Sequence, residues 1–315
     1  MEMGFVGLGK MGRRMVRKLL PEKHSIIIWN RSPGPGESLS EECKKLDRGR
    51  GFVCQLTIAK TLTDMVERLA RPRLIWAMLP AGEPTESVLG TLSNLVESGD
   101  ILVDGGNSYY KDTEKRFNIL KERKIKFLGI GVSGGIIAEK QGYPLMVGGD
   151  KSAYEYIQPI LISLAKPDGG YGYFGTGGAG HFVKMVHNGI EYGIMQSLGE
   201  GFAVLRKAPY KLDLPEIARL YQRGTLVSGF MLDRAVEVLE NNPTLEDIQG
   251  IIAESGEAQW MVEQAQEEGI EVDIIRQALE YRKRSPTDES IQNSFTAKFI
   301  AALRNAFGGH EIQKK

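Results

Sequence analysis

Short apolar runs and amphipathic segments alternate through the first half of the chain. Runs with the length and composition of buried strands occupy residues 3–8, 25–29, 74–79, 101–103, 125–132 and 145–147. Most of the intervals between them show helical periodicity, beginning with residues 10–20. Strands and helices that alternate with short turns are typical of βαβ units, so the pattern predicts a mainly parallel sheet.

Two segments depart from this alternation. The polar stretch 32–50 contains Pro33-Gly34-Pro35-Gly36, and we expect a surface loop there, with about one helical turn. After the glycine-rich turn at 175–178, strand-like runs vanish and helical periodicity dominates. The expected helices occupy residues 179–207, 213–221, 227–240, 257–267, 272–283 and 288–306, with a tail at 308–315. We therefore predict two domains, 1–178 and 179–315, of which the second is all-helical.

Composition limits the possible functions. The chain has 315 residues, with 40 Lys and Arg against 40 Asp and Glu, so its formal net charge is +0. No basic excess would gather nucleic acid or an anionic membrane, so a small anionic substrate must be held by a local cluster. We find no signal peptide and no apolar stretch of about 18 residues, and expect a cytoplasmic protein without membrane spans. Cys43 and Cys54 lack metal-like spacing, and we expect neither a disulfide framework nor a metal site.

The first candidate site is the glycine motif Gly7-Leu8-Gly9-Lys10-Met11-Gly12, which follows a predicted strand and begins a predicted helix. Its first glycine permits a tight turn, its second lets the backbone approach a pyrophosphate, and its third lets helix and strand pack closely. The N–H groups and the dipole at the helix N-terminus favour the pyrophosphate. A βα turn without a nucleotide is the alternative. The motif predicts a Rossmann-type α/β dinucleotide-binding domain over residues 1–178.

The end of the second predicted strand bears on the choice between NAD and NADP. An acidic residue there accepts a hydrogen bond from the ribose 2′-hydroxyl, and it would repel a 2′-phosphate. This chain has Asn30, Arg31 and Ser32 instead, which offer donors, and Arg31 can also stack on adenine. A solvated loop arginine is the alternative interpretation. The turn favours NADP.

The second candidate site is the segment Gly180–Tyr192. On a helix, Lys184, His187, Asn188 and Glu191 share one face because their spacing is i, i+3, i+4 and i+7. Burial and nearby positive charge lower the pKa of a lysine, so it can act as a base while a carboxylate acts as an acid. A solvent-facing stripe with an ordinary Lys–Glu pair is the alternative. After a dinucleotide-binding domain, the pattern favours a catalytic face.

Two further glycine turns follow predicted strands. They are Asp104-Gly105-Gly106-Asn107-Ser108 and Gly131-Val132-Ser133-Gly134-Gly135. Ligands of open α/β sheets bind beyond the carboxyl ends of the strands, where such loops offer backbone N–H groups and polar side chains. Each motif is weak by itself because glycine and serine occur in most loops.

Together these segments carry a family resemblance. The glycine motif, Asp104–Ser108, Gly131–Gly135 and Gly180–Tyr192 occur in the order and at the spacing of 6-phosphogluconate dehydrogenase, within the β-hydroxyacid dehydrogenase superfamily. Residues 304–310 resemble that family's R-x-x-F-G-x-H ending. The resemblance covers nearly the whole chain and is to the short bacterial form, which has a trimmed helical domain. It implies an NADP-dependent oxidative decarboxylation of 6-phosphogluconate to ribulose 5-phosphate and carbon dioxide, in the pentose phosphate pathway and gluconate utilisation.

The resemblance also implies residue roles. Lys184 would be the general base on the 3-hydroxyl and Glu191 the general acid, with His187 and Asn188 beside them. The residues implied to line the sugar acid are Asn107, Ser133, Gly134, Gly135, His187 and Asn188. Those implied at the cofactor are Gly7, Leu8, Gly9, Lys10, Met11, Gly12, Asn30, Arg31, Ser32 and Asn107. No metal is implied.

The phosphate of the substrate would be bound by four further residues. The resemblance implies that Tyr192 and Arg282 reach it, and that Arg304 and His310 come from the tail of a partner subunit. It therefore implies a homodimer or homotetramer with shared active sites.

One departure from the family pattern concerns this phosphate. The long form has K-G-T-G-K-W where this chain has Ser255-Gly256-Glu257-Ala258-Gln259-Trp260. A lysine and a threonine that contact the phosphate are thus replaced by Ser255 and Glu257. Glu257 cannot assist a phosphate while ionised, so the phosphate must depend more on Tyr192, Arg282 and Arg304.

Two rival functions remain open at this point. One is a related β-hydroxyacid dehydrogenase that acts on a small unphosphorylated acid. Such relatives resemble this chain less at His187, Glu191 and the Arg304–His310 ending. The other is a non-catalytic NADP-binding sensor or scaffold, against which the intact Lys184–Glu191 pair argues.

Overall fold

In the computed structural model, the backbone is described for residues 1–50 and 54–314, and the side chains for 1–45 and 54–314. The chain divides into two compact units, Met1–Lys184 and Met185–Lys315. The boundary lies inside the long helix α9 (Ala179–Arg206), whose first turns pack within the N-terminal unit. Each unit contains its own hydrophobic core.

The described part of the N-terminal unit is built on an eight-stranded sheet in the order β3-β2-β1-β4-β5-β6-β7-β8. All neighbouring strands are parallel except β6 and β7, which are antiparallel. The strands are β1 (Glu2–Val6), β2 (Ser25–Trp29), β3 (Gln55–Ile58), β4 (Leu74–Ala77), β5 (Ile101–Asp104), β6 (Lys126–Val132), β7 (Leu145–Gly149) and β8 (Tyr171–Tyr173). The predicted parallel Rossmann-type sheet is confirmed, and its strand order reverses beside β1, where such folds bind ligands.

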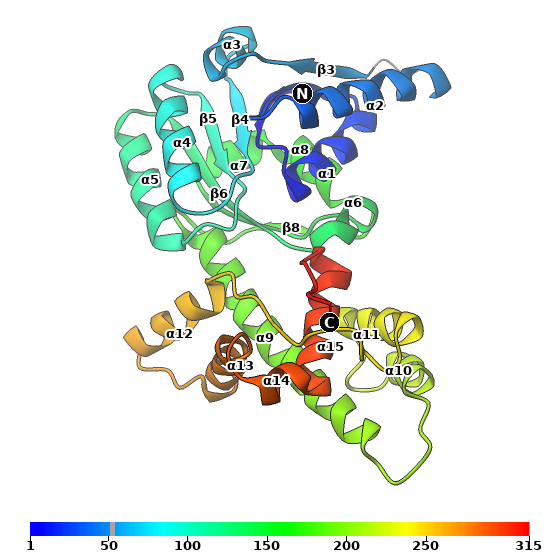
Figure 1. Ribbon diagram of the computed structural model, residues 1–315. Coiled ribbons are helices and arrows are strands. Elements are labelled where there is room, and N and C mark those ends of the chain that lie inside the picture. The colour runs from blue at the N-terminus through cyan, green and yellow to red at the C-terminus, as the bar shows by residue number, and fades with distance from the viewer. Residues whose placement is uncertain (51–53, 315) are drawn as a thin grey trace. The chain divides into compact units, whose positions relative to one another are not determined.

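Helices cover both faces of this sheet (Figure 1). On one face lie α1 (Lys10–Leu19), α2 (Gly34–Arg50) and α8 (Gln158–Ala165), and on the other lie α3 (Leu62–Arg68), α4 (Glu83–Leu95) and α5 (Tyr110–Glu122). Short helical pieces complete the unit: η1 (Leu20–Glu22), η2 (Gly135–Ile137), α6 (Ala138–Gln141) and α7 (Lys151–Tyr156). Because both faces are covered, strands such as β4 and β5 are entirely buried and read as continuous apolar runs.

The second unit is helical, as predicted. After α9 it contains α10 (Leu214–Gln222), α11 (Phe230–Asn241), α12 (Glu257–Glu267), α13 (Asp273–Arg284), α14 (Glu289–Asn293) and α15 (Phe295–Gly308). Its core includes Phe202, Leu239 and Phe299. The single helix expected at 288–306 is instead two, because Ser294 is extended and caps α15 by accepting a hydrogen bond from the Ala297 N–H at 3.1 Å. No helix in the described ranges is long and apolar enough to cross a membrane.

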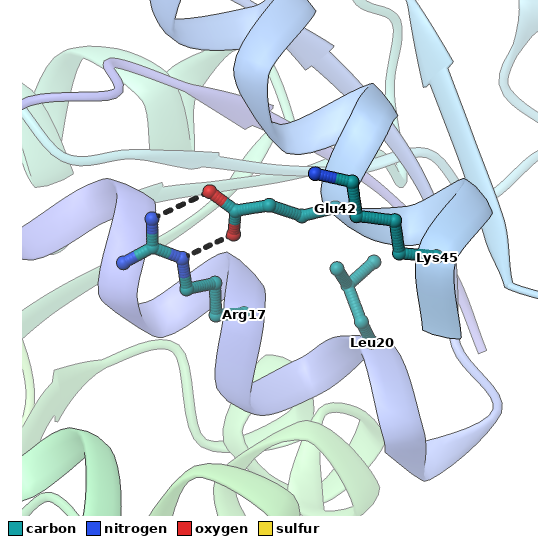
Figure 2. Close-up of a pocket in the computed structure, with 4 residues that line it drawn as sticks. All are labelled: Arg17, Leu20, Glu42 and Lys45. Atoms are coloured by element: carbon teal, nitrogen blue, oxygen red, sulfur yellow. Dashed lines mark hydrogen bonds and ion pairs between the residues drawn. The ribbon is translucent and has the colours of Figure 1, made fainter. Parts of the chain in front are cut away.

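The prediction of a surface loop at residues 32–50 is wrong. Residues 34–50 form α2, which buries Leu39 and Cys43 against the core beside α1. Arg17 of α1 donates from Nη2 to Glu42 Oε1 of α2 at 2.7 Å. A hollow of about 400 Å³ opens at this contact, lined by Arg17, Leu20, Glu42 and Lys45 (Figure 2). Long-range packing thus stabilises a helix whose own sequence favours turns.

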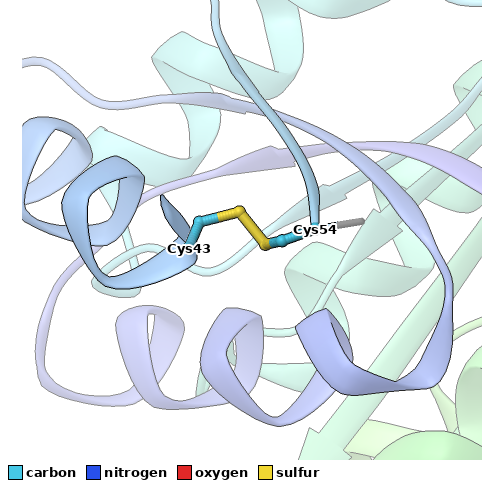
Figure 3. Close-up of a disulfide and its surroundings, with 2 residues drawn as sticks. All are labelled: Cys43 and Cys54. Atoms are coloured by element: carbon cyan, nitrogen blue, oxygen red, sulfur yellow. A yellow bond between two sulfur atoms is a disulfide. The ribbon is translucent and has the colours of Figure 1, made fainter. Parts of the chain in front are cut away.

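Cys43 and Cys54 form a disulfide, contrary to expectation (Figure 3). Cys43 lies on α2, and Cys54 directly precedes β3, with the two Cα atoms 5.6 Å apart. Neither α2 nor β3 was predicted, so nothing in the sequence alone placed the two cysteines side by side. The short strand β8 was not predicted either.

The C-terminal tail is tied to its own unit. Gly309 ends α15 in a left-handed conformation with φ 63°, and Ile312 packs against the helical core. Lys314 forms an isolated antiparallel bridge with Ile248, and the Gln249 N–H donates to the Gln313 carbonyl at 2.9 Å. Residues 309–314 therefore do not form a free terminal extension.

Candidate active site

The glycine motif forms the turn between β1 and α1 in the N-terminal unit. Gly7 has a positive φ of 92°, and a Cβ there would overlap the Met78 carbonyl oxygen. A Cβ on Gly12 would overlap the Gly7 carbonyl, so the third glycine lets α1 begin directly against the turn. Glycine is required at both positions by the packing of the unit itself.

Gly9 differs from these two glycines because a Cβ there would meet no described atom within 4 Å. Gly9 is the N-cap of α1, it provides no side-chain cap, and the first turn of α1 contains no acidic residue. Backbone N–H donors at this helix end are thus left for an anion, without a competing carboxylate. The residues present fit the pyrophosphate of a dinucleotide.

Asn30 connects the glycine motif to the end of β2. Its Oδ1 accepts a hydrogen bond from the Leu8 N–H at 2.9 Å, and its Nδ2 donates to the Ser32 carbonyl at 2.8 Å. Asn30 therefore positions two loops, whereas the sequence interpretation made it a donor to the cofactor. Arg31 and Ser32 are exposed at the same strand end, where the ribose of a dinucleotide lies in this fold.

A buried carboxylate organises the turn after β5. Asp104 is fully buried, and its Oδ1 accepts from the Gly106 N–H at 3.0 Å. Its Oδ2 accepts from Ser108 Oγ at 2.7 Å and from Arg116 Nη1 at 2.9 Å. These bonds fix the backbone of the turn and leave Asn107 exposed within it. Sequence reasoning missed the role of Asp104, although an acidic residue at the end of a buried strand was an available signal.

The turn after β6 carries the second predicted loop. The Ser133 N–H donates to the Pro144 carbonyl at 2.9 Å, and Gly134 has a positive φ of 93°. Ser133, Gly134 and Gly135 are all partly exposed, and Gly135 begins η2. The loop therefore lies at the carboxyl end of a strand, where ligands of open α/β sheets bind.

Glycines on β6 allow the start of α9 to lie directly against the sheet. A Cβ on Gly131 would overlap the Cβ of Lys184, and one on Gly129 would come within 3.0 Å of His181 Nδ1. Lys184 is consequently only 7% exposed. The burial of Lys184 is inconsistent with the solvent-facing stripe considered above.

His181 lies one turn before Lys184 on α9, and sequence reasoning gave it no role. Its Nδ1 lies 2.7 Å from Thr113 Oγ1, and the ring is almost fully buried. Burial lowers the pKa of His181 below its ordinary value. The negative charge of Asp104 opposes this shift, and the positive charge of Arg116 adds to it. A neutral, buried histidine here anchors α9 to α5 and so helps to position Lys184.

The part of α9 in the helical unit continues the polar face. His187 Nδ1 lies 3.1 Å from Asn188 Oδ1 and 3.8 Å from Glu191 Oε2. Asn188 is buried, whereas Ile190 and Ile194 on the same helix are about half exposed, at 51% and 46%. This distribution reverses that of an ordinary amphipathic helix, in which the isoleucines would be buried. The structure therefore brings His187, Asn188 and Glu191 together, as predicted.

A buried cationic group lies beside this face. The Arg282 guanidinium of α13 stacks on the Tyr192 ring of α9, with Cζ 3.3 Å from the ring centroid. Arg282 is 1% exposed and Tyr192 4% exposed. The Tyr192 hydroxyl and Arg282 Nη1 have no hydrogen-bond partner among the described residues. Burial lowers the pKa of Arg282 to about 10, and the nearby Tyr192 opposes this shift.

Arg304 of α15 and Glu257 of α12 complete the group, which we call the arginine cluster: Tyr192, Glu257, Arg282 and Arg304. Arg304 is 5% exposed, and burial lowers its pKa while the charges of Tyr192, Glu191 and Glu257 oppose that effect. Glu257 is 4% exposed, and its Oε2 accepts from Ser255 Oγ at 2.6 Å. The unpaired Arg282 Nη1 and Tyr192 hydroxyl favour a ligand with acceptor oxygens, because an unsatisfied buried polar group is costly.

In its own unit, Arg304 is buried because α15 packs in the helical core. It interacts electrostatically there with Tyr192 and Glu191. The role in a partner subunit's site that the resemblance implied for Arg304 stays a prediction. His310 lies beside Phe307, with ring centroids 6.3 Å apart. In the described ranges, no group of three or more His, Cys, Asp or Glu residues could hold a metal ion.

Family models match both units. Residues 2–178 match the NAD binding domain of 6-phosphogluconate dehydrogenase. Residues 180–290 match the C-terminal domain of 6-phosphogluconate dehydrogenase. The chain belongs to the 6-phosphogluconate dehydrogenase family. The resemblance found in the sequence is therefore confirmed, including its short form.

Individual 6-phosphogluconate dehydrogenases support this membership over the full length. The NAD(+)-dependent, decarboxylating enzyme of Haloferax volcanii is 33% identical, and the match covers 100% of this chain and 99% of the relative. The NAD(+)-dependent, decarboxylating enzyme of Bacillus subtilis is 36% identical over 91% of this chain and 62% of its own length. Both names specify NAD, so these relatives do not support the preference for NADP.

Solved structures agree on the fold. The 6-phosphogluconate dehydrogenase of Plasmodium falciparum, studied apo, with its cofactor NADP+ and with its substrate 6-phosphogluconate, gives a TM-score of 0.82 at 29% identity. That match covers 90% of this chain and 62% of the Plasmodium chain. The 3-hydroxyisobutyrate dehydrogenase of Mycobacterium tuberculosis gives 0.71 at 17% identity over 96% of this chain and 99% of the other, which shows a shared fold only.

Proposed function

We propose that the protein catalyses the oxidative decarboxylation of 6-phosphogluconate to ribulose 5-phosphate and carbon dioxide, with NADP as the oxidant. The arginine cluster is the observation that carries this proposal. Its buried Tyr192 and Arg282 retain polar atoms without partners. An unphosphorylated hydroxyacid lacks the phosphate oxygens that could accept from both groups, which favours a phosphorylated substrate over the runner-up class.

The chain's own residues account for the proton transfers. Lys184, buried against β6, takes the proton of the 3-hydroxyl. A bound nicotinamide would supply the acceptor for the hydride of C3. The protonated Lys184 then polarises the new ketone, so that the β-keto acid loses carbon dioxide without a metal. Glu191, which lies 3.8 Å from His187, donates a proton to C1 of the enediol. Asn188 and His187 orient the sugar acid beside it.

The remaining roles follow from position. Asn107 and the turn Ser133–Gly135 offer groups at strand ends of the N-terminal unit for cofactor and sugar acid. Arg31 and Ser32, exposed after β2, would contact a 2′-phosphate, while the NAD(+)-dependent relatives make NAD the alternative cofactor. Turnover of 6-phosphogluconate with NADP and with NAD, followed by the absorbance of the reduced cofactor, tests both parts. No turnover with either cofactor would exclude the proposal.

We also propose that the protein is a homo-oligomer. On the helical unit, Ile190 and Ile194 of α9 and Ile270 and Ile274 near α13 are 46–70% exposed. A Cβ on Gly193 of α9 would meet Cγ2 of Ile274 at 3.6 Å, so Ile274 lies beside the segment of α9 that carries Ile190 and Ile194. Exposed apolar groups of this kind favour a second copy of the chain. Sedimentation velocity should show a dimer or larger species, whereas a monomer at micromolar concentration would contradict the proposal. The contribution of His310 to a partner's site stays a prediction.

A further inference from the structure

We infer that Glu114 of α5 is a positioning residue for Lys184, because it holds the start of α9 where the proposed base can reach the substrate. This inference rests on the proposed function, in which Lys184 takes a proton from the sugar acid. Glu114 and residues 179–184 of α9 both belong to the N-terminal unit, so the contacts between them lie within a single unit.

The glycine-rich turn before α9 lies directly against α5. The Gly178 N–H donates to Glu114 Oε2 at 2.7 Å. A Cβ on Gly177 would overlap the same carboxylate, and a Cβ on Gly178 would overlap the Tyr110 carbonyl oxygen. Gly177 also has a positive φ of 58°. The close approach of α5 therefore requires glycine at both positions.

Glu114 supplies a negative charge that α9 lacks at its own N-terminus. The first turn of α9 contains no acidic residue. The backbone N–H groups at a helix N-terminus have no partner within the helix and attract a negative charge. Here the carboxylate comes from a neighbouring helix and accepts a charge-assisted hydrogen bond. Because this bond joins two elements, it fixes where α9 begins relative to α5.

Two further contacts join the same face of α5 to the first turns of α9. Tyr110, Thr113 and Glu114 share one face because their spacing is i, i+3 and i+4. Tyr110 packs edge-to-face on Phe182 with ring centroids 5.0 Å apart. Thr113 Oγ1 lies 2.7 Å from His181 Nδ1. All three α5 residues therefore contact the chain within about two helical turns of the proposed base.

The sheet controls a different part of the position of α9. The residues of β6 and β7 that lie against its first turns are Gly129, Gly131 and Gly148, at which a Cβ would overlap or crowd residues 179–184. Glycines allow close approach but present no side chain that could interlock with the helix. The sheet therefore sets how near α9 lies to the strands, whereas the directional hydrogen bonds from α5 set its position along its own axis.

Helix α5 also fixes the turn that carries Asn107. This turn leads directly into α5, and Asp104 at the end of β5 accepts from Ser108 Oγ and from Arg116 of α5. The Asn107 turn and the start of α9 are thus both held by one helix. A general base acts only within hydrogen-bond reach of its proton. A shift of α9 along its axis would therefore move Lys184 away from a sugar acid held at this turn.

Three substitutions of Glu114 separate the geometry of this contact from its charge. Glu114→Gln keeps the length of the side chain and an acceptor for the Gly178 N–H, but it removes the charge. Asn118, whose Nδ2 lies 3.5 Å from Glu114 Oε1, can rotate its amide to accept from the new amide group. Glu114→Asp keeps the charge but withdraws the acceptor by one methylene, and Glu114→Ala removes both. Glu114 is exposed, so we expect all three variants to fold.

The experiment measures kcat and KM with 6-phosphogluconate and the dinucleotide. Glu114→Ala and Glu114→Asp should lower kcat by about tenfold or more, because a small displacement of a reacting group is costly. Glu114→Gln should stay within about twofold of the wild type, since the hydrogen bond that sets the position is kept. The KM for the dinucleotide should not change in any variant, because the glycine motif is unaltered. Glu122→Ala, at an exposed position near the end of α5, is the matched control and should leave kcat unchanged.

Several outcomes would overturn the inference. If Glu114→Gln is as impaired as Glu114→Ala while Glu114→Asp stays active, the charge at the helix end matters and the position does not. If Glu114→Ala lowers the melting temperature without changing kcat, the role of Glu114 is purely structural. If Glu114→Ala is unfolded at the assay temperature, the comparison of Glu114→Asp with Glu114→Gln still decides.

Failure of the inference and failure of the proposed function are distinguishable. If the wild type oxidises 6-phosphogluconate with neither cofactor, the proposed function has failed. If the wild type oxidises it and all three variants are equally active, only the role of Glu114 has failed.

Discussion

At the start of α1, the groups available to an anion are backbone N–H donors, and no side-chain charge is needed. In the arginine cluster of the helical unit, they are the buried side chains of Arg282, Arg304 and Tyr192. The first arrangement is local, since six consecutive residues create it. The second depends on four elements that the fold must bring together. A phosphate can therefore be accommodated either by backbone geometry or by buried charge, and the two solutions should respond differently to mutation.

Substitution of Lys184 should have the largest effect on turnover. Lys184 is also an exception to the comparison, because it is a buried side chain in the N-terminal unit, whose proposed pyrophosphate site consists of backbone N–H groups. Lys184→Ala should lower the turnover number by about 10² to 10⁴, the typical contribution of a general base. Dinucleotide binding, measured by quenching of protein fluorescence, should remain close to that of the wild type. Near-normal turnover would remove Lys184 from its proposed role.

Arg282 tests the side-chain solution directly. Arg282→Leu should weaken the binding of 6-phosphogluconate by about 100-fold, since a charge-assisted hydrogen bond to a phosphate contributes about 1.5–3 kcal/mol to the binding free energy. The affinity for the dinucleotide should not change. Arg276→Leu, at an exposed position of the same helix, serves as the matched control. Equal substrate affinity in the two variants would show that the cluster does not bind the phosphate.

Arg31 adds a side-chain contact to the otherwise backbone-based nucleotide site. Arg31→Ala should reduce the ratio of kcat/KM for NADP to that for NAD by about 10- to 100-fold. Activity with NAD serves as the internal control, because NAD lacks the 2′-phosphate. A wild-type enzyme that prefers NAD, as the names of two relatives indicate for those proteins, would show that the interpretation of residues 30–32 is wrong.

Substitutions in the glycine motif should have the smallest effect on the reaction. They should also separate a role in dinucleotide binding from a role in the stability of the fold. Gly9→Ala should weaken dinucleotide binding by about tenfold while leaving the melting temperature unchanged. A methyl group at Gly9 would contact no described atom of the protein and would instead occupy space proposed for the ligand. Gly12→Ala should instead destabilise the fold by about 1–3 kcal/mol, since its methyl group would overlap the Gly7 carbonyl. Thermal melting with and without NADP distinguishes the two. Equal loss of stability would contradict the assignment of Gly9 to the ligand.

The same contrast explains what could be predicted from the sequence. The motif Gly7–Gly12 and the polar face of α9 depend on spacing within one segment, so their residue positions were enough to locate them. Helix α2 could not be predicted, because Pro33 and Gly34 favour a turn, while the burial of Leu39 and Cys43 and the Arg17–Glu42 ion pair that stabilise the helix are tertiary contacts. Strand β3 is short and mostly exposed, and it is defined by pairing with β2 rather than by its own sequence.

The candidate site shows the same limit. The arginine cluster came from the resemblance alone, since no pattern within the chain relates Tyr192 to Arg282 or Arg304. The burial of Arg304 in its own unit could not be predicted either, because the packing of α15 is a property of the tertiary structure. Asp104 and His181 were overlooked because they act through neighbours: Asp104 fixes a turn and His181 anchors a helix.

The disulfide between Cys43 and Cys54 has a practical consequence. These are the only 2 cysteines in the sequence, and both belong to the N-terminal unit. After reduction, a thiol-reactive dye would therefore label only α2 and the start of β3 and leave the helical unit unmodified. In a variant without this pair, a single cysteine introduced on the helical unit would give a uniquely labelled protein. Fluorescence could then follow each unit separately as dinucleotide or sugar acid is added.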